Sequence, residues 1–184
     1  MIDMRTYKRL KVKGGCYFFT VVLEQRRNNP ILIDHIDALR EAFRQVQQKH
    51  PFKMEAVVIL PDHLHCLWRL PEDCDDYSMR WRLIKSKFSQ AIKKGEVISK
   101  SRQRKAERGI WQRRFWEHLI RDDRDYQHHF DYIHYNPMKH GYVEEVKDWQ
   151  YSSFHHYVEK AVYSEHWAAS NATCALDFES THKP

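Results

Sequence analysis

The chain has 184 residues, a length that favours one domain with a substantial core over two domains. Hydrophobic residues make up 42%, which excludes a disordered chain, and the net charge of +6 fits either a polyanionic partner or an ordinary basic protein. The four cysteines show no C-x-x-C spacing, so neither a disulfide framework nor a cysteine zinc site is expected. The N-terminus has no signal-peptide pattern and no apolar run is long enough to span a membrane, so the sequence predicts a soluble, cytoplasmic protein.

The first half of the chain predicts three strands and a helix. The apolar run 16–24 follows a basic stretch and is typical of a buried strand. Asp34 can cap a helix in which apolar residues recur at helical spacing from Ile36 to Val46, and Pro51 closes it. The runs 52–60 and 63–70, separated by Pro61-Asp62, predict two strands that pair as a hairpin.

The second half predicts two further helices and one strand. The acidic loop 71–78 can cap a helix that Gly95 ends, and residues 96–109 then lose hydrophobic periodicity and indicate an exposed loop. The run 110–120 is read as a fourth strand. Asp122 or Asp123 begins the last helix, which ends near Pro137 and Gly141.

This order predicts an α+β fold with a ferredoxin-like antiparallel sheet. The elements follow one another as β-α-β-β-α-β-α, whose βαββαβ core is the split βαβ pattern. We expect helices on one face of the sheet, an open opposite face for a ligand, and an added C-terminal helix and tail. Residues 1–167 are assigned to a single domain, and residues 168–184 to a polar tail.

Two histidines stand inside the apolar run "PDHLHCLWRL". Side chains two apart in a strand point to the same side, so His63 and His65 share one face and Leu64 and Trp68 take the other. The apolar side suits the helix-covered core, which assigns the imidazoles to the open face. Two adjacent imidazoles can bind one divalent metal, although two ordinary exposed histidines would give the same pattern.

The last helix carries a tyrosine and an asparagine that share a face. Tyr132 lies about 200° around the helix from Phe130, which belongs to the apolar stripe, and Asn136 follows one turn later. The phenol of Tyr132 is a potential nucleophile, and the amide oxygen of Asn136 can complete the coordination of a hard metal ion. The alternative is a surface tyrosine and an asparagine that ends a helix before proline.

The sequence resembles the REP-associated tyrosine transposases, bacterial members of the HUH single-strand endonuclease superfamily. The resemblance spans residues 5–167 and rests on "VVILPDHLHCLWRLP", "RWRLIKSKF", "IWQRRFWEHLIRDDRDYQHHFDYIHYNPMKHGYV" and "DWQYSSFHHYV". It implies that His63 and His65 form the histidine–hydrophobic–histidine metal motif, that Tyr132 is the nucleophile, and that Asn136 is the third metal ligand. Related insertion-sequence transposases usually have Gln at this third position.

The resemblance also implies a reaction and a partner. With bound Mg²⁺ or Mn²⁺, Tyr132 would attack a phosphodiester of single-stranded DNA and form a 5′-phosphotyrosine, which allows rejoining without ATP. The expected substrates are REP-type palindromic hairpins, handled by a monomer or homodimer at the bacterial nucleoid.

Basic residues interleaved with aromatic ones fit a single-stranded nucleic acid. The candidates for phosphate contacts are Arg5, Lys8, Arg9, Lys85, Lys87, Arg113, Arg114 and Lys139. Two alternatives to the transposase interpretation stay open: a non-catalytic protein that binds single strands on the same fold, and a metal-dependent hydrolase that uses water in place of Tyr132. A covalent protein–DNA adduct would separate the hydrolase from the transposase.

Overall fold

The computed structural model describes residues 9–96 and 98–168, and it contains a four-stranded antiparallel sheet in the order β2-β3-β1-β4. Arg5, Lys8 and most of the predicted tail, residues 169–184, lie outside the described residues. The strands are Cys16–Val22 (β1), Lys53–Ile59 (β2), His63–Arg69 (β3) and Trp116–Leu119 (β4). The helices are Ile31–Asp34 (α1), Ile36–Lys49 (α2), Tyr77–Ala91 (α3), Lys100–Gln103 (α4), Asp123–Lys139 (α5), the 3₁₀ helix Val146–Asp148 (η1) and Phe154–Glu159 (α6).

The strand order confirms the predicted ferredoxin-like arrangement. β3 pairs with both β1 and β2, and β4 pairs with the outer side of β1, all antiparallel. β1 and β2 are therefore separated in the sheet by β3, as the split βαβ pattern requires. In this register Thr20 of β1 lies opposite His65 of β3.

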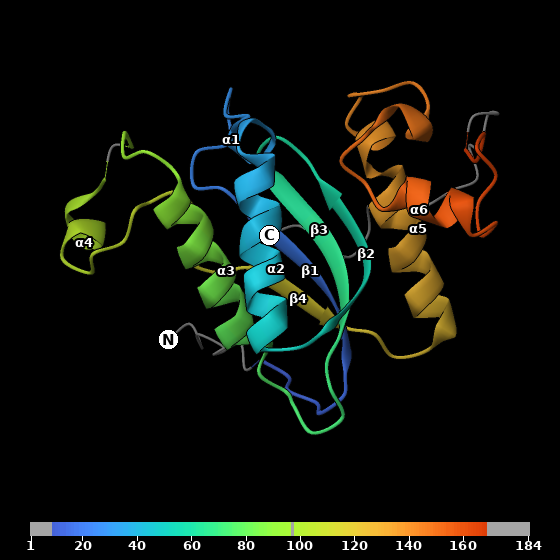
Figure 1. Cartoon of the computed structure of the whole chain (residues 1–184), viewed down its shortest axis with the longest axis horizontal. Helices are drawn as coiled ribbons and strands as arrows, with labels where there is room; N and C mark the ends of the chain where they lie inside the picture. Colours follow the sequence, from blue (N-terminus) through green and yellow to red (C-terminus); the bar gives the residue numbers. More distant parts are fainter. Residues whose placement is uncertain (1–8, 97, 169–184) are drawn as a thin grey trace, which may run out of the picture.

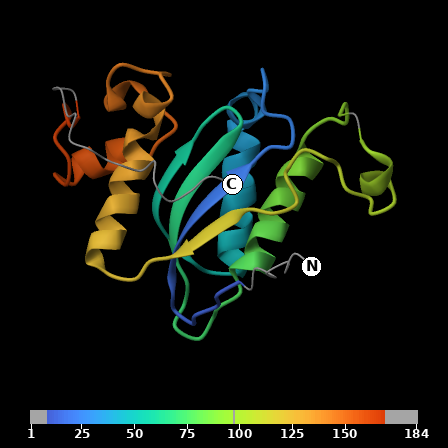
Figure 2. The same cartoon turned by 180° about the vertical axis from the view of Figure 1, so that it is seen from behind.

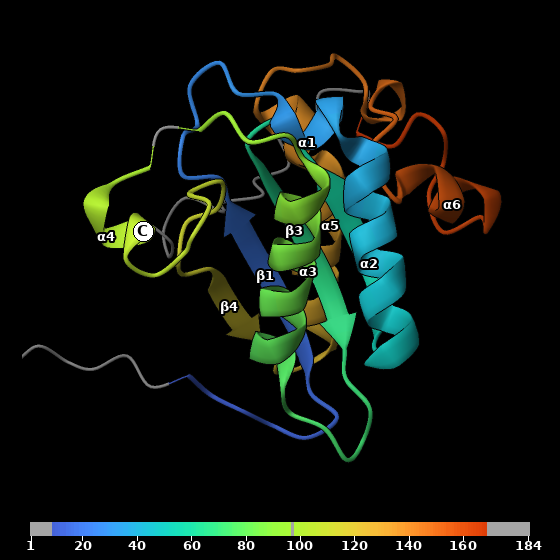
Figure 3. The same ribbon diagram turned by 60° about the vertical axis from the view of Figure 1, so that its left-hand side comes forward.

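Helices α2 and α3 lie together on one face of the sheet (Figure 3). The alternating residues Leu64, Cys66 and Trp68 of β3 point into the core beneath these helices and are fully buried. Trp68 stacks on Trp81 of α3 at a centroid distance of 4.4 Å. The period-2 alternation at residues 63–70 therefore identified the side of the strand that carries the hydrophobic core.

The opposite face of the sheet is covered, and the prediction of an open face was wrong. Helix α5 lies across this face with η1 and α6 beside it, so that the sheet stands between two layers of helices (Figures 1 and 2). Ala56, Val58 and Leu67 of the sheet form a second core with Phe130 and Ile133 of α5. His63 and His65 are consequently only 4% exposed each.

Several predicted boundaries also need correction. Asp34 ends α1 and does not cap α2, whose N-cap is His35. Helix α3 ends at Ala91, four residues before Gly95. β4 begins only at Trp116, because residues 112–114 are exposed and leave the sheet. The loop 96–109 contains α4, whose Arg102 is buried and pairs with Glu24.

The segment after η1 fastens α5 to the edge of the sheet. Ser152 forms a β-bridge with Val58, and the backbone of neighbouring residues continues the pairing with β2, so this edge strand is not left open. His134 of α5 is fully buried, with Nε2 2.9 Å from Ser153 Oγ and Nδ1 3.2 Å from Tyr163 Oη. His134 thus links α5 to the segment that pairs with β2.

This buried histidine predicts a loss of stability in mild acid. Burial lowers the pKa of His134 to about 3, so below its ordinary pKa the unfolded chain binds a proton that the folded chain does not. In metal-free buffer, the free energy of unfolding should fall as the pH drops from 6.5 towards 3, and His134 should account for about 2 kcal/mol at pH 5. His134→Gln should flatten this slope in urea titrations between pH 6.5 and 5; an unchanged slope would contradict the assignment.

No helix in the described part of the chain is long and apolar enough to cross a membrane.

Candidate active site

The two histidines of β3 lie side by side on the face covered by α5. Their ring centroids are 5.0 Å apart. His63 Nδ1 lies 2.6 Å from the carboxylate of Asp62, to which it donates, and Arg26 donates to the same carboxylate at 2.7 Å. Because Nδ1 is engaged in this way, Nε2 is the nitrogen of His63 through which the ring could bind an ion, the arrangement of a carboxylate–histidine–metal unit.

His65 is oriented by the neighbouring strand. Its Nδ1 lies 2.9 Å from Thr20 Oγ1, whereas its buried Nε2 has no hydrogen-bond partner. Burial, followed by the charges of His63 and His140, lowers its pKa well below the ordinary value. A neutral imidazole with an unsatisfied, buried nitrogen is suited to binding a metal ion, since an unpaired polar atom is otherwise costly to bury.

Helix α5 brings Tyr132 and Asn136 to the same place. The Tyr132 ring lies 5.2 Å from the ring of His65 and 5.9 Å from that of Phe18. Asn136 is fully buried one turn later, and neither side-chain atom makes a geometrically sound hydrogen bond. The four residues that the sequence singled out, two from β3 and two from α5, therefore converge on one site.

The environment of Tyr132 favours its protonated form. Burial raises the pKa of the phenol, and the adjacent Asn136 side chain opposes this rise only in part. The ammonium group of Lys139 lies over the Tyr132 ring, 5.1 Å from its centroid. A phenol in this state is a weak nucleophile at neutral pH and needs help to lose its proton.

The residues that hold His63 and His65 in place were not predicted from the sequence. Although burial by itself raises the pKa of Asp62, hydrogen bonds from His63 and Arg26 bring it well below its usual range, so the carboxylate is charged. His140, at the C-terminal end of α5, places its ring 5.2 Å from that of His63. The position of Asp62 directly before the motif was the one available signal; Arg26 and His140 depend on long-range packing.

The predicted phosphate-contact residues are not gathered at one place. Lys139 lies beside Tyr132, whereas Lys85 and Lys87 belong to α3 on the opposite side of the sheet. Arg9 packs over the ring of Phe115 and pairs with Glu117. Of the other candidates, Lys85 donates to a backbone carbonyl, Lys87 to Gln45, and Arg113 to Glu107 and Ser101, while Arg114 is exposed.

The chain matches the model of a known family. The description of that family is "Transposase IS200 like", and its model matches residues 12–136, a region that contains the sheet, the histidine pair, Tyr132 and Asn136. The match covers more than half of the chain, which therefore belongs to the IS200-like transposases.

Individual relatives define the group more closely. A Haemophilus influenzae protein named as a REP-associated tyrosine transposase is 50% identical over 91% of this chain and 95% of its own length. The REP-associated tyrosine transposase of Escherichia coli is 45% identical over 90% of this chain and 92% of its own. The solved structure of such a transposase bound to a REP hairpin superposes with a TM-score of 0.81 at 41% identity, covering 98% of this chain and 99% of that one. The chain is thus a tyrosine transposase of the REP-associated group.

Proposed function

We propose that this transposase nicks and rejoins single-stranded DNA at REP-type hairpins through a covalent bond between Tyr132 and the 5′-phosphate. The observation that carries the proposal is the convergence of a tyrosine with two imidazoles and a carboxamide in one buried site. A protein that only bound DNA would have no use for such a set. The hairpin in the solved relative supports the choice of substrate, and action on DNA would place the protein at the nucleoid.

The residues present fit a divalent metal ion. In each of His63 and His65, one ring nitrogen is hydrogen-bonded and the other is left for an ion. Nε2 of His65 and the amide atoms of Asn136 are buried without a hydrogen bond of good geometry. Two imidazoles and an amide oxygen would leave the remaining coordination positions to water and phosphate oxygens, and these would supply most of the oxygen ligands that Mg²⁺ or Mn²⁺ prefers. When bound, the ion would polarise the scissile phosphate and stabilise charge in the transition state.

The chain's own residues account for the rest of the reaction. The Tyr132 oxygen attacks phosphorus, the bond from phosphorus to the 3′-oxygen breaks, and the proton lost by the phenol ends on that 3′-oxygen. The product is a 5′-phosphotyrosine and a free 3′-OH. Attack of a 3′-OH on the phosphotyrosine reverses these bond changes and restores the phenol. Lys139 lies beside the Tyr132 ring and would pair with the phosphate in this proposal.

The two alternatives lead to different products. A hydrolase that used water would cleave DNA without becoming attached to it, and a pure binding protein would leave the DNA intact. The intact set of His63, His65 and Tyr132 favours the transposase reaction over both.

The direct test is covalent trapping on a single-stranded REP hairpin. The full chain with Mg²⁺ or Mn²⁺ should yield an adduct that survives denaturation in SDS and carries a label placed on the 3′ side of the cleaved bond. A fully paired duplex of the same sequence should react far more slowly, because one phosphate must reach Tyr132 beside the buried side chains of His63, His65 and Asn136. Binding should weaken steeply with salt. Cleavage without an adduct, or equal cleavage of duplex, would overturn the proposal.

A further inference from the structure

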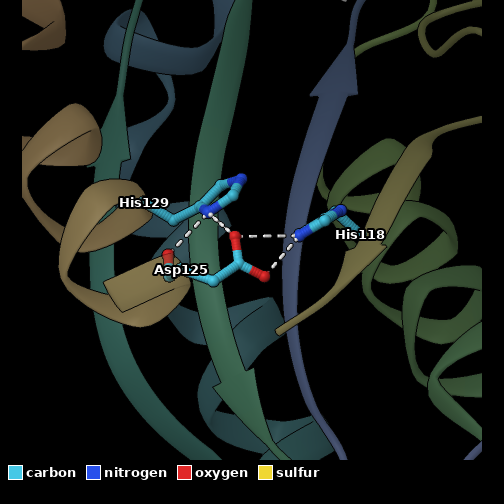
Figure 4. A group of neighbouring side chains, drawn as sticks. All are labelled: His118, Asp125 and His129. Atoms are coloured by element: carbon cyan, nitrogen blue, oxygen red, sulfur yellow. Dashed lines mark hydrogen bonds and ion pairs between the residues drawn. The ribbon is translucent and has the colours of Figure 1, made fainter. Parts of the chain in front are cut away.

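A second group of metal-binding side chains lies where β4 meets the beginning of α5 (Figure 4). It consists of His118 from β4 and Asp125 and His129 from α5, and one ligand atom of each lies within 4.8 Å of the others. The Asp125 carboxylate is within reach of both rings, 2.8 Å from His118 Nε2 and 3.1 Å from His129 Nδ1. Ligands that share a tetrahedral ion at 2.0–2.1 Å lie roughly 3.4 Å apart. The rings of His118 and His129 are stacked, with centroids 4.6 Å apart and planes at 18°, so at least one ring would have to rotate to direct its lone pair at a shared ion.

The protonation of this cluster suits a cation. Burial lowers the pKa of His129 to about 4, which leaves the imidazole neutral at pH 7. Burial alone would raise the pKa of Asp125, but hydrogen bonds led by that from His118 bring it to about 2. A charged carboxylate beside a neutral imidazole is the state in which both bind metal.

The present hydrogen bonds define what an ion would have to replace. His129 Nδ1 donates to the backbone carbonyl of Asp125 at 2.8 Å, and His118 Nε2 donates to the carboxylate. The second nitrogen of each ring points away from the carboxylate (Figure 4). Transfer of the proton to that nitrogen would free the inward lone pair of each ring without changing its charge.

The cluster is separate from the site at His63 and His65. The ring of Phe18 lies between them, with its centroid 5.4 Å from that of His65 and 4.8 Å from that of His129. One ion cannot serve both groups across an intervening phenyl ring. The two groups share a face of the sheet and the helix α5, but not a ligand.

We propose that His118, Asp125 and His129 form a second divalent-metal site, selective for zinc-like ions. Two imidazoles and one carboxylate are a ligand set that Zn²⁺ takes readily, whereas Mg²⁺ prefers oxygen ligands. Because the ligands come from β4 and from the first two turns of α5, a bound ion fixes the N-terminal part of the helix that carries Tyr132 to the sheet. The proposal does not depend on the DNA reaction.

Zinc stoichiometry of the full chain tests this site. In a His63→Ala/His65→Ala background, which removes the other imidazole pair, chelator-treated protein dialysed against micromolar Zn²⁺ should retain one ion per chain. Adding His129→Gln or His118→Gln should abolish this binding. The matched control is His128→Gln, because His128 directly precedes His129 in α5, is exposed and does not belong to the cluster, so this variant should keep the ion.

Thermal unfolding gives a second readout and a check on folding. Zn²⁺ should raise the melting temperature of the background and of the His128→Gln variant, and leave those of the His118→Gln and His129→Gln variants unchanged. Far-UV circular dichroism should show that each variant is folded, and the half-buried His118 offers a milder change than His129. If the folded background binds no zinc, or if both glutamine variants bind it as well as the control, the cluster is a hydrogen-bonded contact only and the proposal is wrong.

Discussion

Replacing Tyr132 by phenylalanine should eliminate the covalent protein–DNA adduct and leave the fold and the affinity for the hairpin nearly unchanged. The change removes one oxygen and keeps the ring, whose contacts with His65 and Phe18 hold α5 against the sheet. Loss of the contact between the phenol and Asn136 should cost at most about 1 kcal/mol of stability. Adduct formation on a labelled hairpin, hairpin affinity and the melting temperature should be measured on the same preparation.

Two other tyrosines of α5 provide matched controls. Tyr126 stacks on Phe130 at 5.7 Å, and burial raises its pKa strongly, so its hydroxyl is a poor nucleophile. Tyr135 is partly buried and packs into the core formed with Phe130. Tyr126→Phe and Tyr135→Phe should both retain the adduct. Peptide mapping that located the DNA on Tyr135 or Tyr126 would refute the choice of nucleophile, even if the reaction itself were confirmed.

The faces of the sheet could be predicted from sequence, but the covering of its second face could not. Alternation assigns Leu64 and Trp68 to one side of β3 because successive side chains in a strand point in opposite directions. The helical pattern of α5 showed one apolar stripe, including Phe130, and so predicted a single buried side. In the structure Phe130 packs against Tyr157 and Tyr163 of the C-terminal segment, while Tyr132 turns to the sheet, so two sides of the helix are covered.

In the site, too, spacing within one strand or helix could be predicted from the sequence, whereas contacts between elements could not. His63 and His65 are two apart in a strand and Tyr132 and Asn136 are four apart in a helix, and both spacings fix a shared face. Their meeting was suggested by family resemblance, not by periodicity. The supporting residue Thr20 could not be found in this way, because its place opposite His65 is set by the register of β1 and β3.

His63→Ala and His65→Ala should each reduce cleavage by about 10²–10³-fold while hairpin binding largely survives. The cleavage rate should fall because each variant removes one of the two imidazoles proposed to bind the metal ion beside Tyr132 and Asn136. Binding should persist, because phosphate contacts and base stacking supply most of the affinity for single strands. Cleavage rates under single-turnover conditions and salt-matched hairpin affinities separate the two effects.

Asp62→Asn adds the control that distinguishes metal binding from a merely structural role of the pair. Asparagine preserves the size of Asp62 but removes the charge that orients His63 through Nδ1. If His63 is a metal ligand, this change should weaken metal affinity by about 10–100-fold, so that cleavage recovers when the Mn²⁺ concentration is raised. His63→Ala should not recover in the same titration, because the ligand itself is missing. If excess Mn²⁺ restored neither variant, and binding and cleavage fell together in both, the pair would serve the fold and not the reaction.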